Sequence, residues 1–327
     1  MNQVVKSSIV PSTTSGSFTA NLVGLSPGQT YYYKSYVIVA GTGEYAAKEK
    51  TITASSYGYF TPAASTVTPA VDASWLELPA ATNTDDYIGT YYSGNDRNYT
   101  HLYDKKKYAS LWTAYPLYES TTGGSRNESW AKNPNLSESE QINIWDGSYG
   151  VDYGSTIYAR GHQIPDADRS NNATMQKHTY YATNLVPQIQ DNFNGGIWMK
   201  LEDAIRKAIP SSDTLYVVTG VAFQKAGGSE AITYIKPKHD TKQCPVPNYF
   251  YKVILKVKRS NAGVVNSASA IGFWFEHKTY TNDSYTNYAV SVDQIEQWTG
   301  FDFFVNVPNA VEATAEKNSS WSDFQSF

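Results

Sequence analysis

The sequence predicts an α+β protein in which a small all-β segment precedes a larger domain of mixed strands and helices. The chain has 327 residues, a length typical of about two domains. Its first 54 residues contain strand and turn signals only. From about residue 75 onward, strand-like apolar runs are mixed with amphipathic helical patterns, which is typical of an α+β domain.

Composition limits the classes of protein that this chain can be. Charged residues make up 17% and aromatic residues 14%, which indicates a globular protein. The apolar runs, such as 215–218, are far too short to span a bilayer, so we expect no membrane span. The single cysteine, Cys244, excludes an intrachain disulfide and a zinc–thiolate cluster. No pattern signals an oligomeric state.

The N-terminal segment carries strand signals around a turn. A strand-like run at 17–22 leads into the turn Gly24–Gly28, and an alternating tyrosine-rich run follows at 31–39. This resembles the latter half of a fibronectin type III module, but about forty matching residues are too few for a whole sandwich. We therefore predict a partial β module over 1–54, a linker rich in Ser, Thr, Ala and Pro over 55–80, and a second domain over 81–327.

The second domain contains two clear helices and several buried strands. One helix is expected from Gly196 to Ile209, ended by Pro210, and the other from Val292 to Trp298, capped by Ser291 and ended by Gly300. The expected strands cover 111–117, 215–220, 250–255 and 267–275.

The run Tyr158–Pro165 places an arginine beside a histidine. In a strand, residues i and i+2 face the same side, so Arg160 and His162 project together as a fixed cation next to a base. This pair suits attack on a phosphodiester, where water loses a proton and negative charge needs support. Gly161 between them is expected to leave room for a substrate backbone.

The helix after Asn194 has two stripes at four-residue spacing. Ile197, Leu201, Ile205 and Ile209 form an apolar face, and Asn194, Trp198, Glu202 and Arg206 form an adjacent, mostly polar stripe. By itself, this polar stripe is explained by a helix cap at Asn194 and a surface ion pair between Glu202 and Arg206.

Net charge is −4, so the whole protein has no electrostatic preference for nucleic acid. The stretch 236–259 differs, because seven basic residues against Asp240 give it +6. Two interpretations stay open: a patch that follows a phosphate backbone, or lysines that protect a strand edge.

Several motifs in order resemble the DNA/RNA non-specific endonucleases, the ββα-metal nucleases. They are Arg-Gly-His-Gln at 160–163, Thr-Asn-Leu-Val-Pro-Gln at 183–188, and Asn-Gly-Gly-Ile-Trp at 194–198 followed by Leu201-Glu202. The resemblance covers about residues 85–310. It implies a ββα-metal fold, with a central mixed or antiparallel sheet flanked by helices.

The resemblance also implies roles for residues. His162 would be the general base, and Asn194 the one direct protein ligand of Mg²⁺, with Mn²⁺ or Ca²⁺ as alternatives. Glu202 would hold waters around the metal, and Asn184 would orient a group of the site. Arg160 and Arg206 would contact phosphate, while Arg126 matches an upstream arginine only loosely. The substrates would be DNA and RNA, and the products would carry 5′-phosphates.

Some positions depart from the family pattern or compete for roles. Ala159 stands where the family often has an acid, and we expect it to point away from His162. Asn192 competes with Asn194 for the metal. Asp166, Asp168 and Arg169 suit a salt-bridged turn better than a second metal contact, and Trp198 a packing role. The other histidines, at 101, 178, 239 and 277, are interpreted as surface or packing residues.

The leading hypothesis is thus a secreted, periplasmic or cell-surface metal-dependent nuclease. Residues 1–30 lack a signal-peptide pattern, so export rests on the adhesion-like β segment alone. The alternatives are a nucleic-acid-binding protein with weak or no catalysis and a surface adhesion protein.

Overall fold

The computed structural model describes residues 75–80, 86–149, 158–211, 213–261 and 263–327, together with the backbone of four short N-terminal strands. Contacts divide the chain into two compact units, one of residues 1–70 with 81–85 and one of residues 71–80 with 86–327. The expected strand at 17–22 and the turn at 24–28 lie outside the described residues.

In the first unit, β1 (Thr30–Tyr33) pairs antiparallel with β4 (Lys50–Thr53), and β2 (Tyr36–Val39) pairs antiparallel with β3 (Gly43–Ala46). The tyrosine-rich run therefore forms two strands, where the alternation predicted one. The resemblance to a fibronectin type III module remains a prediction.

The second unit is built on one antiparallel sheet of seven strands in the order β15-β14-β13-β10-β7-β6-β5. Its strands are β5 (Tyr87–Ser93), β6 (Asp96–Asp104), β7 (Ala109–Leu117), β10 (Leu215–Ala222), β13 (Tyr249–Arg259), β14 (Val265–Glu276) and β15 (Ala289–Val290). The four strands predicted for this domain are β7, β10, β13 and β14, and the α+β class is confirmed.

Two small ladders accompany the sheet, both antiparallel. They pair β8 (Tyr158–His162) with β9 (Leu185–Ile189) and β11 (Thr233–Ile235) with β12 (Cys244–Val246). The described helices are α1 (Ala173–Thr179), α2 (Met199–Lys207), α3 (Val292–Thr299), α4 (Asn309–Ala315) and α5 (Trp321–Ser326). None of these helices is long and apolar enough to cross a bilayer.

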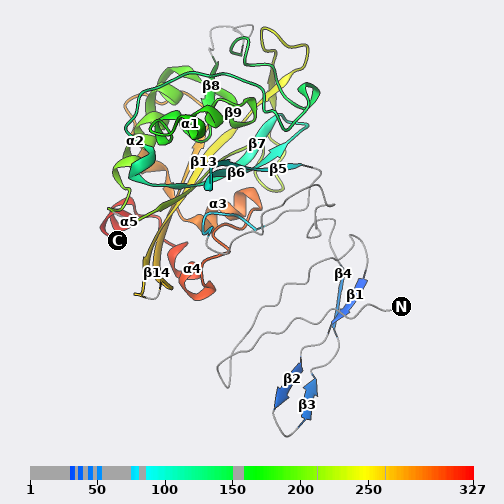
Figure 1. The fold of residues 1–327 in the computed structure, drawn as a ribbon. Coiled ribbons are helices and arrows are strands. Elements are labelled where there is room, and N and C mark those ends of the chain that lie inside the picture. Colours follow the sequence, from blue (N-terminus) through cyan, green and yellow to red (C-terminus); the bar gives the residue numbers. More distant parts are fainter. Residues whose placement is uncertain are drawn as a thin grey trace. The chain divides into compact units, whose positions relative to one another are not determined.

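The central strands are apolar on both faces, because a layer covers each side. Along β13, Phe250 and Ile254 face one core, while Tyr251, Val253 and Leu255 face the other. Figure 1 shows α1, α2, β8 and β9 on one side of the sheet and α3 and α4 on the opposite side. The sheet is thus the middle layer of three.

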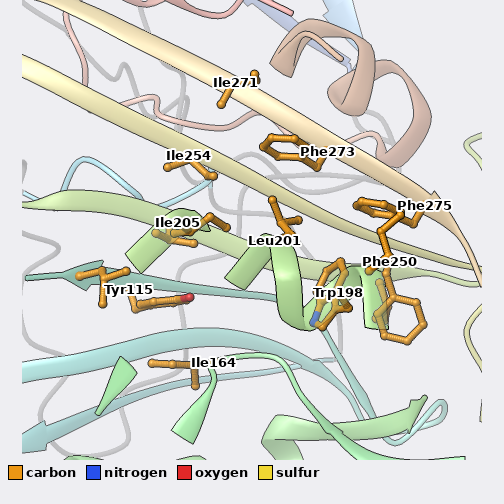
Figure 2. Close-up of a cluster of buried hydrophobic side chains, with 14 of the residues drawn as sticks. Tyr115, Ile164, Trp198, Leu201, Ile205, Phe250, Ile254, Ile271, Phe273 and Phe275 are labelled. Atoms are coloured by element: carbon orange, nitrogen blue, oxygen red, sulfur yellow. The ribbon is translucent and has the colours of Figure 1, made fainter. Parts of the chain in front are cut away.

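The layer that contains α2 buries a dense apolar cluster. Leu201 and Ile205 of α2 point onto the strands, next to Ile254, Ile271 and Phe273 (Figure 2). The predicted apolar stripe of this helix is therefore its buried face, and α2 is held firmly against the sheet.

On the other side, α3 has the ends that its sequence predicts. The Ser291 hydroxyl accepts a hydrogen bond from the backbone N–H of Gln294, and Gly300 ends the helix in the left-handed conformation at φ 76°. The segment 75–80 also packs here, since Leu76 and Leu78 are buried in this core and Glu77 pairs with Arg97. The described end of the expected linker is therefore part of the folded unit.

Candidate active site

An open cleft of about 790 Å³ lies over the α2 layer of the sheet. Four segments line it: the loop 124–130, the region from β8 to residue 170, the segment 190–195, and α2. Six of the seven predicted site residues line this one cleft: Arg126, Arg160, His162, Asn194, Glu202 and Arg206.

Strand β8 presents the cation and the base together. The guanidinium carbon of Arg160 lies 3.9 Å from the centre of the Trp130 ring, and the His162 ring lies 5.4 Å from the same indole, centre to centre. Arg160 also donates a hydrogen bond of 3.0 Å to the carbonyl of Ile144. Trp130, which was not among the site residues predicted from the sequence, thus packs against both side chains.

Gly161 faces the other way. A Cβ at this position would lie 2.5 Å from Cβ and 2.5 Å from Oε1 of Gln188, which lies on β9 two residues beyond Val186, the ladder partner of Gly161. The expectation that Gly161 makes room for substrate is therefore wrong: its close neighbour is Gln188. Ala159, expected to point away from His162, also lines the cleft.

The imidazole of His162 is held neutral. Burial, and then the positive charges of Arg126 and Arg160, lower its pKa to about 3. The Tyr180 ring meets it edge-on at 5.2 Å. Its buried Nε2 has no hydrogen-bond partner among the described residues. At neutral pH the imidazole ring is therefore uncharged and can accept a proton.

The sequence predicts that Asn194 caps a regular helix, but in the structure it does not. The segment Gln190–Trp198 is loosely wound, with non-helical backbone at 191, 192 and 196, and α2 begins only at Met199. The adjacent glycines 195 and 196, poor helix formers, account for the late start. The Asn194 side-chain amide donates a hydrogen bond of 3.0 Å to Oε1 of Gln190.

This hydrogen bond orients the Asn194 amide. Among the described residues, no hydrogen bond occupies its Oδ1. The competitor Asn192 is exposed, has a positive φ of 59°, and does not line the cleft. The geometry therefore favours Asn194 as the oxygen donor.

Glu202 lies on α2 opposite a buried lysine. Lys252 of β13 places its Nζ 3.9 Å from Oε1 of Glu202 and donates a hydrogen bond of 2.6 Å to the Thr219 hydroxyl. The same ammonium lies 4.8 Å from the centre of the Trp198 ring. Burial raises the pKa of Glu202 to about 7, and Lys252 opposes that rise.

Lys252 is not among the site residues that the sequence predicts. The signal was a single lysine within the apolar strand run 250–255, since a fully buried lysine needs a partner.

Arg206 forms ion pairs with aspartates instead of Glu202. Its Nη1 lies 2.8 Å from Oδ1 of Asp168, and its Nη2 lies 2.5 Å from Oδ1 of Asp203. Tyr115 donates a further hydrogen bond of 2.9 Å to the Asp168 carboxylate. The surface pair considered for Glu202 and Arg206 is not formed, and Asp168 serves in a salt-bridged turn.

Two of the predicted site residues, Asn184 and Arg126, differ strongly in how far they are buried. Asn184 is fully buried and does not line the cleft; its amide bonds both backbone groups of Ile164 and the carbonyl of Thr179 at 2.8–3.1 Å. Asn184 therefore holds the backbone turn after His162 in place without lining the cleft itself. Arg126 is half exposed at the cleft, where it pairs with Glu128 at 2.9 Å.

Two lysines of the basic stretch 236–259 lie in the interior of the fold, away from any surface patch or sheet edge. Its strand β13 lies between β10 and β14, and its side chains at Lys252 and Lys256 are buried. Both interpretations of this stretch are therefore wrong for these two lysines. Trp198 is buried in the core, as predicted, and the histidines at 101, 178, 239 and 277 do not line the cleft.

Comparisons with known proteins identify the family of this chain. The family model for DNA/RNA non-specific endonucleases matches residues 82–310. A nuclease from Serratia marcescens is 29% identical over 205 residues, which cover 62% of this chain and 71% of the relative. A nuclease from Nostoc sp. is 28% identical over 221 residues, with coverage of 67% and 75%.

More distant similarity points the same way. Nuclease 1, mitochondrial, from Schizosaccharomyces pombe is 25% identical over 221 residues, covering 65% of this chain and 66% of that protein. A chain in the crystal structure of the EndoG/EndoGI complex matches with a TM-score of 0.53 and 22% identity, covering 75% of this chain and 96% of that chain. This structural likeness supports the fold.

Proposed function

Since this chain belongs to the DNA/RNA non-specific endonuclease family, we propose that it hydrolyses phosphodiester bonds of DNA and RNA with the help of a divalent metal ion. The observation that carries the proposal is one cleft that holds a neutral histidine, an amide oxygen free to bind a cation, and several arginines.

His162 acts as the general base. Its neutral ring takes the proton from the water that attacks phosphorus, and the new imidazolium then passes that proton to solvent. Because burial, and then the positive charges of Arg126 and Arg160, disfavour the charged ring, His162 does not become blocked by protonation in weakly acidic solution. Trp130 and Tyr180 keep the ring in place during the proton transfer.

The residues of the cleft fit Mg²⁺ or a similar hard cation. Asn194 would hold it through Oδ1, since Gln190 engages the other end of the amide. When bound, the cation would polarise the phosphate and stabilise the leaving oxygen. Glu202 would accept hydrogen bonds from waters around it, which requires the charged carboxylate that Lys252 supports.

Arg160 and Arg206 would bind the phosphates on either side of the reacting bond. Both are anchored by neighbours, Arg160 by Trp130 and Arg206 by Asp168, so little side-chain freedom is lost when substrate binds. Contacts confined to phosphate and sugar carry no sequence information, which agrees with non-specific cleavage. We propose that the products end in 5′-phosphate and 3′-hydroxyl groups.

Two substitutions test this assignment. His162→Ala should lower the rate of plasmid cleavage by about 10²–10⁴-fold while leaving Mn²⁺ binding, measured by calorimetry, unchanged. Asn194→Ala should instead raise the metal concentration needed for half-maximal rate. His239→Ala, at an exposed histidine outside the cleft, is the matched control.

Equal cleavage by wild type, His162→Ala and Asn194→Ala would refute the site. Intact plasmid at millimolar Mg²⁺ would instead favour a nucleic-acid-binding protein without catalysis. Deletion of residues 1–70 tests the adhesion alternative, because the nuclease proposal requires that hydrolysis survives. Export remains part of the proposal and is checked by locating the protein in cell fractions.

A further inference from the structure

A second group of carboxylates lies in the α3–α4 layer, on the sheet face opposite the cleft. Asp293 and Glu296 belong to α3, and Glu316 directly follows α4. One carboxylate oxygen from each of the three lies within 4.8 Å of the other two. A backbone hydrogen bond of 2.9 Å from Val292 to the carbonyl of Glu316 holds the two elements together.

The cluster contains a buried acceptor without a partner. Glu316 is only 5% exposed, and its Oε1 has no hydrogen-bond partner among the described residues. Glu296 accepts one hydrogen bond of 2.7 Å, from the backbone N–H of Phe303. None of the three carboxylates forms an ion pair with a residue that the structure describes. A buried carboxylate normally has a cation or a hydrogen-bond donor beside it, and the Oε1 of Glu316 has neither among the described residues.

Their proton affinities show how strongly the charges are opposed. Burial first, and then repulsion from neighbouring acids, raise the pKa of Glu316 to about 9 and that of Glu296 to about 7. Glu312 and Asp302 contribute to the repulsion on both groups. Without a cation the cluster is relieved only by taking up protons.

The donor set favours a hard cation. All three donors are carboxylate oxygens, the ligand type that Ca²⁺ and Mg²⁺ prefer. Ca²⁺ binds carboxylates in flexible geometry, whereas Mg²⁺ demands a near-ideal octahedron and usually keeps several waters, so a site built from three carboxylates suits Ca²⁺ better. A mix of exposed and buried carboxylates also gives Ca²⁺ a path from solvent.

We propose that Asp293, Glu296 and Glu316 form a structural Ca²⁺ site, separate from the catalytic cleft, that fastens the end of α4 to α3. The ion would bind the three clustered oxygens and supply the partner that the buried Oε1 of Glu316 lacks among the described residues. Its effect is on stability, because the site lies on the far face of the sheet from His162 and Asn194.

The test uses the chain carrying Asn194→Ala, in which metal binding in the proposed catalytic cleft is weakened, so that the second site dominates the titration. Calorimetric titration should show one Ca²⁺ per chain, with a dissociation constant of about 10⁻⁴–10⁻³ M, as in weak Ca²⁺-binding modules. Glu316→Gln should abolish this binding, and Asp293→Asn, at an exposed position that the fold tolerates, should weaken it about tenfold or more.

Stability gives the second measurement. At about 100 times the dissociation constant, Ca²⁺ should raise the melting temperature of the Asn194→Ala protein by about 5–10 °C. Glu316→Gln should remove that shift, while the control Glu276→Gln, an exposed acid outside the cluster, should keep it. Absence of Ca²⁺ binding, or binding that survives Glu316→Gln, would overturn the proposal and leave a proton-sharing cluster.

Discussion

The buried contact between Lys252 and Glu202 makes a sharp prediction about pH dependence. Glu202 has a raised pKa of about 7, so it is protonated in acid and charged above neutrality. His162, with a pKa of about 3, stays neutral across the same range. We therefore expect kcat/KM to rise with pH through about 7, on the titration of Glu202 and not of the histidine.

Lys252→Met tests this assignment. Two unit charges 3.9 Å apart interact by about 4 kcal/mol at an effective dielectric constant of about 20, which corresponds to about 3 pKa units. Because Glu202 is partly exposed, solvent reduces the effect, and we expect a rise of about 1–3 units. At pH 7 the charged fraction of Glu202 would then fall from about half to below about one tenth.

The assay is initial-rate cleavage of single-stranded DNA from about pH 5 to about pH 9. The acid limb of the Lys252→Met profile should move upward by the same 1–3 units, with activity recovering in base. Lys256→Met is the matched control, since Lys256 is on the same strand and face but bonds the carbonyl of Phe324. Identical profiles for folded wild type and Lys252→Met would refute the reasoning.

Three further substitutions test other parts of the site. Gly161→Ala forces a contact with Gln188 and should cost about 1–3 kcal/mol in urea unfolding; unchanged stability would contradict the close packing. Asn184→Leu leaves the backbone groups of Ile164 unpaired and should lower the unfolding free energy by more than about 2 kcal/mol, whereas a smaller loss would show that Asn184 does not hold this turn. Arg126→Ala, at a half-exposed position, should change the unfolding free energy by less than about 0.5 kcal/mol. The same substitution should raise KM and lower the slope of log binding constant against log salt concentration by the amount expected for about one phosphate contact. An unaltered slope would exclude phosphate binding by Arg126.

Local patterns predicted the parts of the site that depend on local geometry. The i, i+2 spacing in a strand is enough to place Arg160 and His162 on one side, where both meet Trp130. The ends of α3 likewise follow from Ser291 and Gly300, whose capping preferences act over a few residues.

Features that depend on tertiary contacts were missed or misjudged. The polar stripe through Asn194 assumed one continuous helix, but the backbone from 190 to 198 is wound differently before α2 begins. Lys252 lies fifty residues beyond Glu202 in the sequence, and only the pairing of β13 within the sheet brings them together. Gly161 was interpreted from its neighbours in sequence, whereas its constraint comes from Gln188 on β9.

The position of Lys252 has a consequence for when the candidate site is complete during synthesis. A nascent chain that ends before β13 already contains His162, Asn194 and Glu202, but it lacks the ammonium that keeps the Glu202 carboxylate charged. It also lacks two strands, β13 and β14, on which the α2 layer packs. A complete site therefore requires that β13 and β14 have been synthesised and have paired with the rest of the sheet.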